Sequence, residues 1–66
     1  MIVTYVVGTK VIGEVCENFV FNTQDKTLSY RAPSGALIME KKVGSLIVYD
    51  NGIELFRYNK GEEDGN

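Results

Sequence analysis

The feature that most constrains the fold is the dipeptide Asn51-Gly52, which is flanked on both sides by residues typical of β-strands. A type I′ turn requires positive φ at both central residues, and Asn followed by Gly satisfies that requirement best. The pair therefore predicts a two-residue hairpin, with Val48 opposite Leu55. On the other face of this ribbon we expect a second apolar set, consisting of Ile47, Tyr49, Phe56 and Tyr58.

Both faces of this hairpin are thus largely apolar, whereas a sheet with one solvated side alternates apolar and polar residues. The chain has 66 residues, of which 44% are hydrophobic. A domain of this size buries only about 60% of the surface that its unfolded chain exposes. Its core rarely supplies more than about 3–5 kcal/mol. The apolar surplus predicts that the protein covers part of its surface by contact with itself or with another protein.

The sequence offers neither a disulfide nor a metal site to reinforce so small a core. Cys16 is the single cysteine and histidine is absent, so no internal disulfide and no zinc site are expected. We expect Cys16 to be a small buried hydrophobe, and a free thiol favours a cytoplasmic location. The apolar start over residues 1–7 is too short to span a membrane and lacks the features of a secretory signal.

The first sixteen residues predict another hairpin. Gly8-Thr9 fits a type II′ turn, because glycine suits the first central position of that turn. Tyr5 and Ile12 then meet on one face of the ribbon. Gly13, inside the second strand, predicts a bulge or bend.

Residues 18–31 predict a third hairpin, with residues 23–26 as its polar loop. This is the one hairpin with a clearly solvated side. We expect its apolar face to be the centre of the core, and that face consists of Phe19, Phe21, Leu28 and Tyr30.

Residues 35–42 are ambiguous. Pro33 and Gly35 interrupt the preceding strand, because proline cannot donate to a ladder and glycine permits positive φ. We expect a strand after them that pairs with residues 45–50. The alternative is a short helix over 35–42, capped by Ser34, although a helix of about two turns is marginal on its own.

These elements predict an all-β fold, a small antiparallel meander of five to six strands. Closure into an SH3-like or OB-like barrel is expected, because closure removes exposed edges; the alternative is a sheet completed across a dimer. We expect residues 1–60 to form a single small β domain. Residues 61–66 are glycine-flanked and acidic, which predicts a disordered tail.

The sequence carries no catalytic signature. Without histidine, Ser–His and Cys–His nucleophile pairs cannot form within the chain, and no glycine-rich phosphate-binding motif is present. Carboxylate pairs such as Glu14 with Glu17 remain, but we do not expect so small a chain to offer a cleft that would desolvate them. The prediction is a protein that is not an enzyme and uses no cofactor or metal.

We therefore predict a protein-interaction module, either an oligomeric adaptor or a stoichiometric inhibitor of a larger protein, such as a viral accessory protein of a phage or mobile element. Its expected partners are itself, as a homodimer or higher oligomer, and an unidentified protein, with no membrane involved. Aromatic residues concentrate at the centres of interfaces. The predicted partner-binding residues are accordingly Tyr49, Phe56, Tyr58, Ile47, Tyr5 and Ile12.

Binding of single-stranded nucleic acid is the alternative, because small barrels stack bases on aromatic residues while cations follow the backbone. The residues for it are Tyr30, Arg31, Lys41, Lys42, Arg57 and Lys60. The net charge of −2 argues against it, since nucleic-acid binders usually carry a strong basic footprint. A minor alternative is an acidic mimic of nucleic acid. Without the tail acids Glu62, Glu63 and Asp64, however, seven cations face six acids, a net charge of +1.

Overall fold

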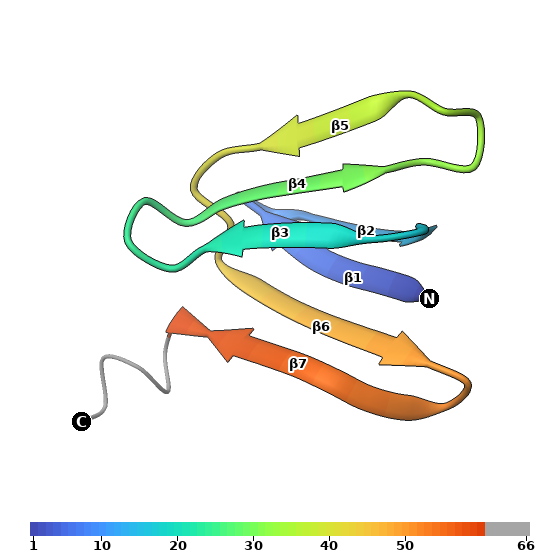
Figure 1. Ribbon diagram of the computed structural model, residues 1–66. Helices are drawn as coiled ribbons and strands as arrows, with labels where there is room; N and C mark the ends of the chain where they lie inside the picture. Colours follow the sequence, from blue (N-terminus) through green and yellow to red (C-terminus); the bar gives the residue numbers. More distant parts are fainter. Residues whose placement is uncertain (61–66) are drawn as a thin grey trace.

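The computed structural model describes residues 1–60 and shows an all-β chain of seven strands (Figure 1). The strands are β1 (Ile2–Val7), β2 (Lys10–Val15), β3 (Phe19–Asn22), β4 (Thr27–Arg31), β5 (Leu37–Glu40), β6 (Ser45–Asp50) and β7 (Ile53–Asn59). The predicted fold class is confirmed, with seven strands where five to six were expected. The predicted tail, residues 61–66, lies outside the described residues.

The strands form two antiparallel sheets, one of four strands in the order β2-β1-β6-β7 and one of three in the order β3-β4-β5 (Figure 1). The expected closed barrel is not found among the described residues. The chain leaves one sheet for the other after β2 and again after β5, so neither β2 and β3 nor β5 and β6 continue a common ladder. Backbone hydrogen bonds still join the sheets at both ends, from Glu17 N to Arg31 O (3.3 Å) and from Val43 N to Lys26 O (3.0 Å).

The core lies between the two sheets. Its centre is made of side chains with at most 1% exposure, from β1, β4, the loop before β6, and β6: Val3, Tyr5, Leu28, Tyr30, Val43, Leu46 and Val48. The prediction for the third hairpin is confirmed, since Leu28 and Tyr30 are buried and Phe19 and Phe21 pack against the core. The aromatic rings of β3 also meet those of β7, with ring centroids of Phe21 and Tyr58 5.1 Å apart.

The turn of the last hairpin is confirmed, because φ is 53° at Asn51 and 78° at Gly52. The predicted register holds for only the first two pairs. A β-bulge then shifts it, so that Val48 lies opposite Phe56 rather than Leu55. Leu55 is the extra residue that such a bulge inserts into one strand.

The bulge changes which side chains share a face. From Phe56 onward the alternation of β7 is reversed relative to the prediction, so Phe56 lies beside Val48 and Tyr58 beside Leu46. Both aromatic residues therefore point toward the core. The expectation that they share a face with Ile47 and Tyr49 is wrong for this reason.

The first hairpin has the predicted turn, with φ of 63° at Gly8. The bulge predicted at Gly13 is not present, because the β1–β2 register is continuous, with Gly13 opposite Thr4. A Cβ atom at position 13 would lie 3.7 Å from the Thr4 Oγ1 atom, which is an ordinary contact. Neither the local conformation nor crowding therefore requires glycine here.

Residues 37–40 form strand β5, which confirms the strand and excludes the helix predicted as its alternative. The predicted pairing with residues 45–50 is wrong, because β5 pairs with β4, with Arg31 opposite Leu37. The reason is the turn between them: Ala32 N donates to Ala36 O (2.9 Å), which folds the chain back along β4.

Candidate interaction face

One side of the four-stranded sheet packs on the three-stranded sheet, and the other side has no second layer among the described residues (Figure 1). Successive side chains of a strand point to opposite faces, so burial of Val3 and Tyr5 fixes which residues point outward. We call the uncovered side the outer face. Its positions on β1, β2 and β6 are Ile2, Thr4, Val6, Val11, Gly13, Val15, Ser45, Ile47 and Tyr49.

The outer face is apolar and well exposed. Val11 is 71% exposed, Val15 54%, Ile2 50% and Tyr49 37%. Thr4 and Ser45 are its only polar side chains on these three strands, and no charged residue lies among them. Contiguous apolar surface of this kind marks interaction sites on small proteins, whereas isolated exposed apolar residues need no explanation.

The charged residues of the outer face lie on the edge strand β7, which we call the rim. Arg57 lies opposite Ile47, and its guanidinium binds Glu54, with 2.8 Å between Nη2 and Oε1. The hydrogen bonds from Arg57 lower the pKa of the Glu54 carboxyl. The rim therefore presents an acid and a base that neutralise each other beside the uncharged strands.

The six predicted partner-binding residues are divided by the structure. Ile47 and Tyr49 lie on the outer face. Tyr5 and Tyr58 are buried in the core, and Ile12 and Phe56 are partly buried against it. The bulge accounts for the two β7 residues. For Tyr5 and Ile12, both faces of the first hairpin are equally apolar, so alternation alone gave no basis for choosing the inward side.

Sequence reasoning missed three of the most exposed members of this face, Ile2, Val11 and Val15. The available signal was the size of Tyr5. Aromatic side chains dominate the energetics of a core, so the ribbon face that carries Tyr5 is the better candidate for the inside. The face with Val11 and Val15 is then the outer one.

A buried polar chain crosses the core between the sheets. The hydroxyls of Tyr5 and Tyr30 are 2.9 Å apart, and the Tyr30 hydroxyl donates a hydrogen bond to the Glu14 carboxylate. Burial is the main cause that raises the pKa of both tyrosines. Tyrosines held neutral in this way serve as hydrogen-bonding groups rather than as bases. Their role in this geometry is to connect the two sheets.

The residues predicted for nucleic-acid binding do not share one surface. Tyr30 is buried and cannot stack on a base. Arg31 donates to the carbonyl of Gly35 (2.9 Å) at one end of β4, and Arg57 is paired at the rim of the outer face. Lys42 and Lys60 do come together at the opposite end of the molecule, where they line one pocket.

Comparisons with protein-family models, with curated proteins and with solved structures find no match to this chain. Within residues 1–60, no helix is long and apolar enough to cross a membrane. Over the same range, no group of three or more His, Cys, Asp or Glu side chains is placed to hold a metal ion.

Proposed function

We propose that this protein is a non-enzymatic interaction module that self-associates through its outer face. The observation that carries the proposal is the uncharged, exposed surface of β1, β2 and β6, on which Val11 of the edge strand β2 is 71% exposed. Covering such a surface removes apolar area from water, which favours assembly.

A second copy of the chain fits this face, because two uncharged apolar surfaces are complementary to each other. Sheets stack face to face about 10 Å apart and contact through interdigitated apolar side chains. Two outer faces brought together would desolvate no charge on these three strands, because the Arg57–Glu54 pair lies at the rim. The stack would form four layers, with a three-stranded sheet on each outside.

The size of the face limits the area that a contact can bury. The three uncharged strands, about 4.8 Å apart and six residues long at about 3.4 Å each, cover roughly 300 Å² in projection. Stable interfaces bury about 800 Å² of accessible surface per partner. Since accessible area exceeds projected area on a corrugated sheet, this face supports an interface at the small end of the range. We expect a reversible dimer in the micromolar range.

The test is sedimentation velocity over a concentration series, with two matched substitutions. Val11→Lys places a charge on the outer face, and Val20→Lys places the same charge on the exposed side of the three-stranded sheet. The two valines are 71% and 70% exposed, so the variants differ in location and not in exposure. We expect Val11→Lys to raise the dimer dissociation constant at least about tenfold, which is about 1.4 kcal/mol. Val20→Lys should leave it unchanged.

Two results would contradict the proposal. A wild-type chain that stays monomeric at millimolar concentration would rule out self-association. Equal weakening by Val11→Lys and Val20→Lys would place the contact elsewhere or show that it depends only on net charge.

The remaining parts of the proposal assume that the protein acts by surface contact and not by catalysis. As an adaptor or a stoichiometric inhibitor, the module would need no cofactor, and its second partner would be another protein that offers a flat apolar face. We place it in the cytoplasm because its single cysteine, Cys16, is buried and unpaired. Burial also raises the pKa of the Cys16 thiol, which keeps it uncharged and unreactive.

A further inference from the structure

All the lysines of this chain lie at one end of the molecule. The β1–β2 turn, the β3–β4 loop, the β5–β6 loop and the end of β7 meet there (Figure 1). These segments carry Lys10, Lys26, Lys41, Lys42 and Lys60. Of the carboxylates within the described range, only Asp25 and Glu40 lie at this end. Five cations that are scattered in the sequence thus converge against two acids.

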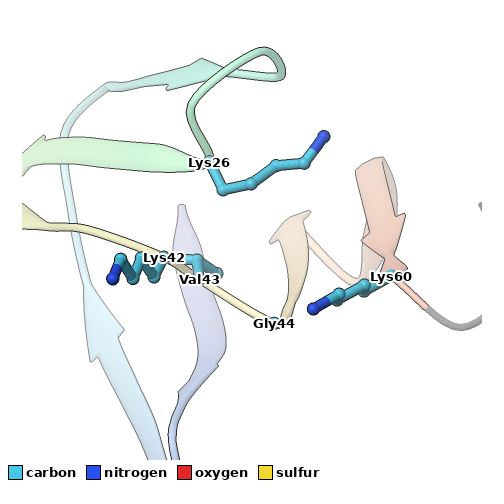
Figure 2. A pocket seen from close by; sticks show the side chains of 5 residues that line it. All are labelled: Lys26, Lys42, Val43, Gly44 and Lys60. Atoms are coloured by element: carbon cyan, nitrogen blue, oxygen red, sulfur yellow. The ribbon is translucent and has the colours of Figure 1, made fainter.

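A pocket opens at this end, with a volume of about 310 Å³. Its lining consists of Lys26, Lys42, Val43, Gly44 and Lys60, and it includes no carboxylate among the described residues. In Figure 2 the side chain of Lys60 extends toward Gly44, whereas the ammonium groups of Lys26 and Lys42 are directed away from Gly44. The volume lies at the lower limit for small-molecule sites.

The backbone around the pocket is held by hydrogen bonds between segments that are distant in sequence. Val43 N donates to Lys26 O (3.0 Å), Gly44 N to Val6 O (2.9 Å) and Lys60 N to Gly44 O (3.2 Å). The Lys26 ammonium donates to the carbonyl of Thr23 and lies 5.0 Å from the centre of the Tyr58 ring. These hydrogen bonds therefore fix the backbone from which the three lysine side chains extend.

Two of these lysines adopt a backbone conformation that lysine disfavours. Within residues 1–60, three non-glycine residues have positive φ: Lys26 (61°), Lys42 (59°) and Asn51 (53°). Asn51 is in a turn that favours asparagine, whereas glycine or asparagine would suit positions 26 and 42 better than lysine does. Unfavourable backbone conformations concentrate at functional sites. Lysine thus occupies two positions beside the pocket where the backbone conformation favours glycine or asparagine.

We propose that this pocket binds a small ligand that carries two or more phosphate groups, independently of the outer face. Ammonium groups make charge-assisted hydrogen bonds to phosphate oxygens. Lys60 would hold a phosphate beside Gly44, and Lys26 and Lys42 would contribute by rotation of their side chains toward the pocket. Lys10 and Lys41 add to the field that attracts an anion to this end.

The test is a titration of the ¹⁵N-labelled chain with pyrophosphate, against sodium chloride of matched ionic strength. We expect saturable shifts of the Val43, Gly44 and Lys60 amides that chloride does not reproduce. Lys60→Gln and Lys42→Asn should each weaken binding by about fourfold, the effect of one unit charge at about 5 Å in water. Lys41→Gln is the control, because Lys41 has the same charge but does not line the pocket.

Lys42→Asn also tests the backbone argument. Asparagine tolerates positive φ, so this variant should melt at the same or a higher temperature while it binds pyrophosphate more weakly. A loss of folding would contradict the assignment of a binding role to this lysine.

Three other outcomes would overturn the proposal. Equal weakening by Lys41→Gln would show a diffuse field rather than a site. Shifts reproduced by chloride would show general ion association. A short oligonucleotide that binds more tightly than pyrophosphate, with affinity that grows with its length, would identify a nucleic-acid surface. Tyr49→Thr, which should weaken the dimer only, must leave pyrophosphate affinity unchanged, so failure of the two proposals can be told apart.

Discussion

The two sides of the four-stranded sheet are similar in composition and opposite in environment. On the inner side, Val3, Tyr5, Leu46 and Val48 are at most 1% exposed. On the outer side, Val11 is 71% exposed although it belongs to the same sheet. Hydrophobicity therefore does not distinguish the two sides. What differs is the second layer, because β3, β4 and β5 cover one side and no strand within residues 1–60 covers the other.

The inner side is also marked by its polar atoms. The Tyr5 and Tyr30 hydroxyls meet across the core and continue to the Glu14 carboxylate. A buried hydroxyl without a partner is costly, so this chain of hydrogen bonds favours one relative placement of the two sheets. The outer side has no such polar connection on β1, β2 and β6. The reversible contact that we propose for the outer side depends on this difference.

The largest effect that would sharpen this comparison is expected from Phe56→Ala. The Phe56 ring lies 5.9 Å from the rings of both Phe19 and Phe21, on the inner side. Because the side chain is partly buried, we expect a loss of about 2–3 kcal/mol in the free energy of unfolding, which is much of what a domain of this size has. Urea unfolding followed by circular dichroism measures it.

Sedimentation of the same variant shows whether Phe56 contributes to the core or to the outer face. Wherever Phe56→Ala is still folded, its dimer dissociation constant should equal that of the wild type. A variant that keeps its stability but loses association would show that Phe56 belongs to the contact surface instead.

An intermediate effect is expected from alkaline pH. Burial raises the pKa of Tyr5 and Tyr30 in the folded state, so above about pH 10 the unfolded chain loses protons that the folded chain retains. The stability contributed by these groups is complete below pH 10 and falls as the pH rises further. Above pH 10 the slope rises toward a limit of about 1.4 kcal/mol per pH unit for each tyrosine, and urea unfolding between pH 8 and about pH 11 measures it.

Two substitutions show how much each tyrosine contributes to this pH dependence of stability. Tyr30→Phe should reduce it and should also cost about 1–2 kcal/mol at neutral pH, because the Tyr5 hydroxyl loses its partner. Tyr5→Phe should cost less, because the Tyr30 hydroxyl keeps Glu14. The reverse order of these two losses would contradict the proposed direction of the hydrogen-bond chain.

Turn chemistry explains which parts of the fold the sequence predicted. Asn51-Gly52 and Gly8 identified two turns, because few residues suit positive φ. The third hairpin was predicted with its correct faces, because it alone alternates apolar with polar residues. The pairing of β5 with β4 was missed, because strand pairing depends on where the chain turns and not on the strand itself.

The candidate site was harder to predict for two physical reasons. The bulge at Leu55 has no sequence mark such as glycine or proline, yet it moves Phe56 and Tyr58 from the predicted face into the core. The lysine pocket joins Lys26, Lys42 and Lys60 from three separate segments. Its cations look dispersed along the chain, and only the way the strands fold together brings them to one end.

The smallest effect on stability, and the clearest test of the outer side, is expected from Tyr49→Thr. Tyr49 is 37% exposed and lies opposite Ile2 on the outer face, and threonine is also a good strand former. The free energy of unfolding of the monomer should therefore change by less than about 0.5 kcal/mol. The dimer should nevertheless weaken about tenfold, because tyrosine is a residue on which interface energy concentrates. Urea unfolding at low micromolar concentration and sedimentation at high concentration measure the two quantities on one sample. A Tyr49→Thr chain that unfolds easily would place Tyr49 with the inner residues, and the two sides of the sheet would then no longer differ in the way their exposure implies.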